Sequence, residues 1–128
     1  LVAAFNTAAA YPAEIFTADA VVTDELPPFV WNATNGGAKQ WWSDLVADPG
    51  TARHAQFVAA KQHVEIGAPE FVRVSGTGAW FIAPSVLQYT VAGKTHVQKG
   101  RWLFYLRRED DAWKISAHAW DELSDVVA

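Results

Sequence analysis

Apolar and aromatic side chains dominate the last third of the chain, where residues 97–123 form two dense hydrophobic runs around one polar pentapeptide, residues 107–111. No Pro interrupts either run, so the pattern predicts two long strands joined by a tight polar turn. A two-stranded ribbon is only marginally stable in water. The sequence therefore predicts that these strands pair with others and bury one face under the helices at the front of the chain.

The front of the chain has the apolar spacing of short helices. Across residues 1–10 the apolar side chains recur at helical intervals, as at the end of a helix that began earlier. Pro12 suits the first turn of a second short helix, which turns Ile15 and Phe16 inward and ends at residues 18–19. We expect both segments to cover the sheet.

An early strand and one longer helix follow. Residues 20–26 form a β-branched run that two prolines end, which predicts a first strand at an edge of the sheet. After a loop at residues 29–37, residues 37–48 place their apolar side chains on one helical face, with Asn35 as a candidate N-cap and Asp-Pro-Gly as the stop. Residues 51–61 fit either a linker or a short strand.

The rest of the pattern is that of β-strands. Strands are predicted over residues 63–66, 70–75 and 79–91, with a Gly-Thr-Gly segment marking a bend or bulge between the last two, and residues 92–94 form a hairpin turn. Because helices come first and a run of antiparallel strands follows, the sequence predicts an α+β domain with helices on one face of a curved antiparallel sheet.

Composition narrows the class of protein. The 128 residues suit one domain with a proper core, and 51% hydrophobic against 19% charged residues is the balance of a folded globular protein. Seven Trp are many for this length, so we expect some of them to line a cavity or an interface. The net charge is −4 and the basic residues are scattered, which argues against a nucleic-acid partner.

The sequence lacks the features that identify several other classes of protein. Without Cys there is no disulfide framework, thiol nucleophile or thiolate metal site, and the spacing of His63, Glu65 and His96 is too generic to predict a metal site. We expect no cofactor, because neither a Gly-rich phosphate loop nor a nucleophile elbow is present. Neither a membrane-spanning run nor a signal peptide is seen, so we expect no membrane partner and favour the cytoplasm. The chain does not begin with Met, which is compatible with a removed leader or a missing start of the first helix.

Particular segments resemble one family. Residues 16–24, FTADAVVTD, are similar to the family's F-ADDA-V-D segment, and Trp41 falls on the expected third helix. Residues 100–102, 107–115 and 118–120 extend the match over nearly the whole chain. In these segments the chain resembles the cone-shaped α+β family of nuclear transport factor 2 (NTF2), steroid Δ-isomerase and the SnoaL-like polyketide cyclases. The resemblance implies an NTF2-like cone with an apolar pocket open at one end, but no single activity, because the family hosts many chemistries.

The resemblance also implies candidate catalytic residues. Asp24 stands where the isomerases keep the carboxylate that shuttles a proton, and desolvation in an apolar cone would raise its pKa. The isomerases also need two acidic donors for the developing enolate. The aspartate among these falls at or beside Leu103 and the tyrosine at or before Leu1, so this oxyanion site is not matched. Of the Arg-x-Asp used by epoxide hydrolases of this fold, only Arg101 is present.

Strand alternation decides which side chains share a face. On the last strand His118 and Trp120 share one face. Trp120 resembles the indole that some isomerases point into the pocket, which sends His118 inward too. Trp113 and Ile115, on the opposite face, also look like core residues, and a single bulge would change the assignment.

The sequence-based hypothesis is a single domain, residues 1–128, that forms a homodimer through the outer face of its sheet and takes a small, largely hydrophobic molecule. Asp24 is the candidate base or acid, with His118 and Tyr105 polarising a carbonyl. The expected ligand-binding residues are Phe16, Trp31, Trp42, Arg101, Leu103 and Trp120.

Two alternatives stay open. Asp24 is also compatible with a solvated strand end or turn residue in a non-catalytic ligand-binding or dimerisation module, which explains the missing oxyanion donors. The second alternative is a protein-interaction adaptor, for which we expect an exposed apolar patch and no closed cavity.

Overall fold

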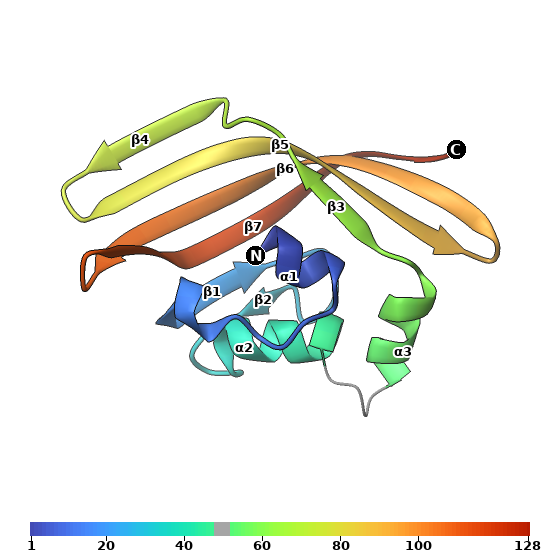
Figure 1. Cartoon of the computed structure of the whole chain (residues 1–128), viewed down its shortest axis with the longest axis horizontal. Coiled ribbons are helices and arrows are strands. Elements are labelled where there is room, and N and C mark those ends of the chain that lie inside the picture. Colours follow the sequence, from blue (N-terminus) through green and yellow to red (C-terminus); the bar gives the residue numbers. More distant parts are fainter. Residues whose placement is uncertain (48–51) are drawn as a thin grey trace.

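Seven strands form one curved, unclosed sheet in the computed structural model, which describes residues 1–47 and 52–128 (Figure 1). The strand order is β2-β1-β7-β6-β5-β3, and β4 also pairs with β5. The strands are β1 Phe16–Thr23, β2 Val30–Trp31, β3 His63–Ile66, β4 Phe71–Ser75, β5 Gly78–Val91, β6 Lys94–Glu109 and β7 Ala112–Val127. β1 runs parallel to β7 and the other pairings are antiparallel, so the sheet is mixed and not purely antiparallel as the sequence predicted.

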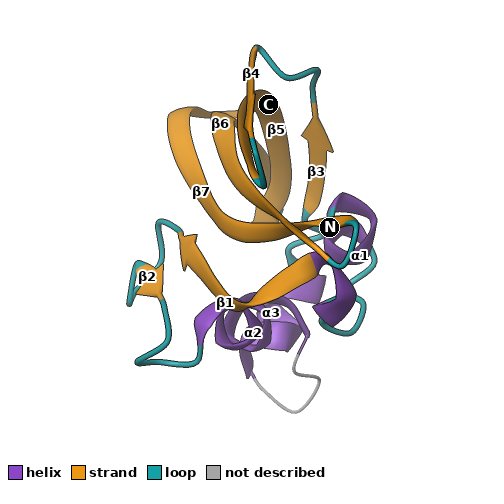
Figure 2. Cartoon of the chain, turned by 90° about the vertical axis from the view of Figure 1, so that its left-hand side faces the viewer, coloured by secondary structure: helices purple, strands orange, loops and turns teal. Residues whose placement is uncertain are grey.

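The helices are short and lie on one side of the sheet in both views (Figures 1 and 2). They are α1 Val2–Asn6, the 3-10 turn η1 Ala13–Ile15, α2 Gly37–Trp42, the π-helical turn η2 Ser43–Ala47 and α3 Ala52–Ala59. The architecture is therefore α+β, with a few short helices beside a curved sheet. No helix in the described ranges is long and apolar enough to cross a membrane.

The helix predictions were only partly right. α3 occupies the segment that the sequence left between a linker and a strand. The predicted cap Asn35 does not cap α2, because its Oδ1 accepts a hydrogen bond from the Asn32 N–H at 2.7 Å and Gly36, in the left-handed region, precedes the helix. The predicted Asp-Pro-Gly stop lies outside the described residues.

The long C-terminal hairpin is confirmed. β6 and β7 pair along their length around a two-residue turn, Asp110-Asp111, in which both residues have positive φ. The predicted turn between β5 and β6 is also confirmed, with positive φ at Ala92 and Gly93. Two-residue turns of this kind match the right-handed twist of the strands, and Asp, Asn and Gly favour them.

Three strand predictions need correction. β1 begins at Phe16, inside the predicted second helix, and β2 pairs beyond it, so β1 is not at the edge. The Gly-Thr-Gly segment is a hairpin turn and not a bend in one strand, because Ser75 pairs with Gly78. Pro84 falls where β5 exchanges β4 for β3 as its partner, a place where a strand tolerates a missing N–H.

Tryptophan side chains build much of the core. Trp31, Trp41 and Trp42 are fully buried, and they join Trp102 and Phe104 of β6 in one hydrophobic cluster. This cluster connects α2 to the inner face of the sheet and holds the elements around the cavity described next.

A bulge in β7 decides which of its side chains face inward. Tyr105 pairs with Ala117 whereas Leu106 pairs with Ile115, so one residue of β7 is unpaired between them. As a result Ile115 and His118 are both buried, although strict alternation puts them on opposite faces. Trp113, also expected in the core, is 42% exposed.

Candidate functional site

A cavity of about 290 Å³ lies between the helices and the inner face of the sheet. Most of its wall is aromatic or aliphatic, which suits an apolar ligand body. No Lys or Arg is among the described residues that line it. The lining residues are Phe5, Asp24, Glu25, Leu26, Trp41, Leu45, Gln62, Val64, Leu87, Tyr89, Gln98, Trp102, His118 and Trp120.

Asp24 follows the last residue of β1, which carries its carboxylate to the cavity wall. Its Oδ2 accepts a hydrogen bond from Trp41 Nε1 at 2.9 Å, and its Oδ1 accepts one from the Glu25 N–H at 2.7 Å. Burial raises the pKa of Asp24 above its ordinary value, and these two hydrogen bonds oppose the rise in part. The carboxylate is thus held in place and is more basic than a solvated one.

His118 is 3% exposed and lies in the middle of β7. Trp102 Nε1 donates to its Nδ1 at 3.1 Å. Because an indole N–H can only donate, Nδ1 is the unprotonated nitrogen and Nε2 carries the hydrogen. Burial lowers the pKa of His118 to about 3, so the ring is neutral near pH 7.

The Nε2–H of His118 is buried and has no hydrogen-bond partner among the residues that the structure describes. Leaving a buried donor unpaired costs roughly 1–3 kcal/mol, and such groups in native proteins call for an explanation. The His118 side chain is also one of those that line the cavity.

Trp41 connects the two polar groups. Its ring centroid lies 4.6 Å from that of His118, edge to face, while its N–H holds Asp24. Phe16, Trp102 and Phe104 surround the imidazole on its other sides. Asp24 and His118 therefore pack against one rigid indole in an aromatic setting.

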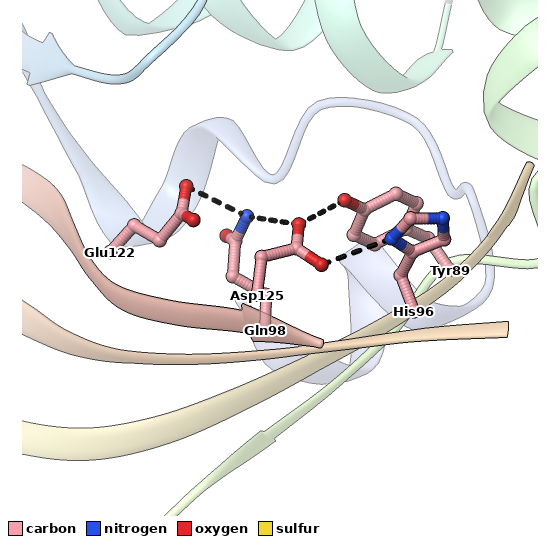
Figure 3. A network of polar contacts seen from close by, with 5 residues as sticks. All are labelled: Tyr89, His96, Gln98, Glu122 and Asp125. Carbon is pink, nitrogen blue, oxygen red and sulfur yellow. Dashed lines mark hydrogen bonds and ion pairs between the residues drawn. The ribbon is translucent and has the colours of Figure 1, made fainter. Parts of the chain in front are cut away.

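Figure 3 shows a polar network of five side chains, Tyr89, His96, Gln98, Glu122 and Asp125. Trp120, on the cavity wall, is hydrogen-bonded to Gln98 of this network. Trp120 Nε1 donates to Gln98 Oε1 at 2.8 Å, and Gln98 Nε2 donates to Glu122 and Asp125 at 3.1 and 3.4 Å. The Tyr89 hydroxyl donates to Asp125 Oδ2. The pKa of Tyr89 is raised to about 12, and this hydrogen bond is the largest cause of the rise.

Three carboxylates lie beside the lining of the cavity: Glu25 is a lining residue, and Glu122 and Asp125 accept hydrogen bonds from Gln98, which is another. Asp125 Oδ1 lies 3.0 Å from Nδ1 of His96, whose ring stacks on Tyr89. Glu25 Oε1 accepts a hydrogen bond from the Glu122 N–H at 3.0 Å. Burial, and after it the Glu122 carboxyl, raise the pKa of Glu25. We call Glu25, Glu122 and Asp125 the acidic mouth.

The structure brings together three of the residues that the sequence singled out: Asp24, His118 and Trp120 line the same cavity. It places Tyr105 elsewhere, 47% exposed on β6. Arg101 is exposed as well and donates to Asp121 Oδ2 at 2.8 Å. Tyr105, Arg101 and Leu103 share the outer face of β6, because Trp102 and Phe104 occupy the inner one.

The other expected ligand-binding residues lie in the core and not on the cavity wall. Trp31 Nε1 donates to Asp44 Oδ2 at 2.9 Å, and Trp42 Nε1 donates to the Ala9 carbonyl at 3.0 Å. Phe16 stacks on Tyr11 with ring centroids 5.2 Å apart. All three support the site from behind.

Sequence reasoning missed Trp102, Gln98 and the acidic mouth. The alternation of Trp102 with Phe104 was visible, but choosing the inner face required a reference point on the neighbouring strand. The acidic mouth joins residues from β7 and from the loop after β1, and no local pattern reports such a contact. In the described part of the chain no group of three or more His, Cys, Asp or Glu is placed to hold a metal ion.

Comparison with known proteins gives the fold. No protein-family model matches the chain, and no curated protein matches it. A candidate aromatic ring hydroxylase from Novosphingobium aromaticivorans superposes with a TM-score of 0.71 at 18% identity, covering 99% of this chain and 85% of that one. A candidate scytalone dehydratase from the same organism gives 0.73 at 10% identity, with 99% and 79% covered. Hexachlorocyclohexane dehydrochlorinase LinA type 2 gives 0.68 at 13% identity, with 91% and 72% covered.

The chain has an NTF2-like fold. The resemblance seen in the sequence is thereby confirmed at the level of the fold. At these identities an NTF2-like fold implies no particular activity, so the function has to be argued from the cavity.

Proposed function

We propose that the chain binds a small, largely hydrophobic molecule in the cavity and catalyses cofactor-free proton transfer on it. The observation that carries this proposal is the buried Nε2–H of His118, which has no partner among the described residues and belongs to a side chain that lines the same apolar cavity as Asp24. A base and a hydrogen-bond donor in a mostly apolar cavity are the two groups that proton abstraction beside a carbonyl needs.

The proposed reaction uses one carboxylate twice. Asp24 takes a proton from the carbon next to a ligand carbonyl, and the electron pair of the broken C–H bond moves onto the carbonyl oxygen. His118 Nε2–H donates a hydrogen bond to this oxygen as its negative charge develops. The protonated Asp24 then returns the proton to the same carbon or to another one, which leaves the ligand exchanged or isomerised.

Two features support this chemistry. The raised pKa of Asp24 makes its carboxylate a stronger base than a solvated one. The neighbours of this fold named as a candidate scytalone dehydratase and as a hexachlorocyclohexane dehydrochlorinase carry the names of enzymes that act on small organic molecules. Tyr105, which the sequence offered as a second electrophile, is left out of the proposal because of its place on the outer face.

Tryptophan fluorescence tests the binding step. Titration with flat bicyclic ketones such as β-tetralone is expected to give saturable quenching, since three Trp line the cavity. The variant His118→Phe is expected to weaken ketone binding about tenfold, the effect of one lost hydrogen bond, and to leave binding of the parent hydrocarbon unchanged. His63→Phe, a change outside the cavity lining, is the control. Absence of saturable quenching, or equal ketone affinity in His118→Phe, would contradict the proposal.

An interaction module is the second candidate, because β4 exposes apolar side chains. Phe71, Val72 and Val74 are 50%, 54% and 65% exposed. Such side chains favour association, and we propose that two copies of this single domain pair through the outer face of the sheet. Sedimentation analysis tests this pairing independently of the ligand.

A further inference from the structure

The acidic mouth carries negative charge, and its basic neighbour among the described residues is His96, 3.0 Å from Asp125. In the described part of the chain no Lys or Arg forms an ion pair with Glu25, Glu122 or Asp125. The ionisable groups among the cavity-lining residues are Asp24, Glu25, Tyr89 and His118, none of them a Lys or Arg. Negative charge at the rim is therefore offset only by neutral donors and by His96.

Hydrogen bonds hold this charge beside an aromatic wall. Because Trp120 donates to the oxygen of Gln98, the amide nitrogen of Gln98 must face Glu122 and Asp125. Glu25 in turn is held by the Glu122 N–H. The carboxylates thus keep a fixed place next to the Trp120 indole, although neutral donors do not cancel their charge.

A second, independent feature of the same cavity is the imidazole of His118. His118 is buried, and within residues 1–47 and 52–128 its Nε2–H has no hydrogen-bond partner. Both His118 and Glu25 line the cavity, so a molecule that fills it contacts an aromatic interior and the acidic mouth at once.

We propose that the ligand of this cavity is a hydrophobic cation, with a flat ring system against Trp102 and Trp120 and an ammonium group at the acidic mouth. An ammonium group brings three donors, for which Glu25 and Glu122 supply carboxylate acceptors. The adjacent indole adds attraction for the cation. A carboxylate or phosphate at the same place would meet like charge, and no Lys or Arg is among the described residues that line the cavity. This inference rests on the proposed function, because it names the class of molecule that the same cavity takes.

Three probes that share the naphthalene ring system but differ in charge test the proposal. They are naphthylmethylammonium, naphthylmethanol and naphthoate, each titrated by calorimetry at neutral pH and low salt. The ammonium is expected to bind about tenfold more tightly than the alcohol, as for one charge-assisted hydrogen bond at a partly exposed site. Naphthoate is expected to bind more weakly than the alcohol.

Charge removal at the mouth localises the effect. Glu25→Gln keeps an oxygen for the Glu122 N–H and is expected to lower ammonium affinity about threefold or more, with alcohol affinity unchanged. The double variant with Glu122→Gln is expected to abolish the preference, whereas Glu70→Gln, a charge change outside the cavity lining, leaves it intact. Equal binding of ammonium and alcohol, or a preference that survives the double variant, would overturn this inference while leaving the cavity as a binding site. No binding of any probe would overturn the cavity function as well.

Discussion

Replacing Asp24 with Asn is expected to slow proton exchange on a bound ketone by at least about 100-fold, the lower end of what a positioned general base contributes. Asn keeps the shape of the side chain and one acceptor oxygen but cannot take up the proton. In the wild type, Trp41 and the Glu25 N–H each donate to a different oxygen of Asp24. The Asn variant has only one oxygen, so one of these two hydrogen bonds is lost, at a cost of about 1 kcal/mol in stability.

The measurement is deuterium incorporation next to the carbonyl of β-tetralone in heavy water, followed by proton NMR and corrected for the reaction without protein. Asp121→Asn removes a carboxylate on the outer side of β7, where it pairs with Arg101, and is the matched control. It is expected to exchange the ketone at the wild-type rate. If Asp24→Asn keeps that rate while still binding ketone, Asp24 is not the base.

The stability of the protein is expected to fall as the pH drops from neutral to 5, because His118 resists protonation in the folded state. Its pKa is about 3 when folded, against an ordinary value of 6.5. Below pH 6.5 the unfolded chain takes up a proton that the folded chain does not, so the free energy of unfolding falls until the pH reaches about 3. The slope approaches about 1.4 kcal/mol per pH unit, which gives a loss of about 2 kcal/mol at pH 5.

Urea unfolding at pH 7 and pH 5 measures this loss, and His118→Phe isolates it. The raised pKa values of Asp24 and Glu25 act in the opposite direction, since the folded state then binds more protons as the pH falls. These carboxyls are present in both proteins, so the difference between wild type and His118→Phe reports His118. The wild type is expected to lose about 2 kcal/mol more than the variant. Equal losses would show that His118 takes up its proton normally in the folded protein.

The order of strands in the second half of the chain, with two of its hairpins, was predictable from the sequence, because strand periodicity and turn residues are local patterns. The hairpin of β6 and β7 shows in two dense apolar runs around one polar turn, and the turn at Ala92-Gly93 shows in its residue types. α3 was missed although Ala52–Ala59 is amphipathic at the helical period, because eight residues are too few for the period alone to distinguish a helix from other structure. β1 was misplaced by four residues because Phe16 suits the inner face of a helix as well as that of a strand.

Only part of the candidate site was predictable from the sequence. Asp24 came from the resemblance and His118 from alternation beside Trp120, and the structure brings both to one cavity. Tyr105 and Leu103 were assigned to the wrong face of β6, because alternation gives two faces without saying which is inner. The bulge near Ser116 and the contact between Glu25 and Glu122 depend on strand pairing, which residue types alone do not report.

The most direct test of the central claim is the nitrogen-15 spectrum of the His118 imidazole, with and without saturating β-tetralone at neutral pH. Our account predicts a neutral ring with the hydrogen on Nε2, as the Trp102 N–H on Nδ1 requires, and a shift of the Nε2–H resonance on adding ketone that the parent hydrocarbon does not cause. A hydrogen on Nδ1, or an Nε2–H signal that ignores the bound ketone, would contradict it.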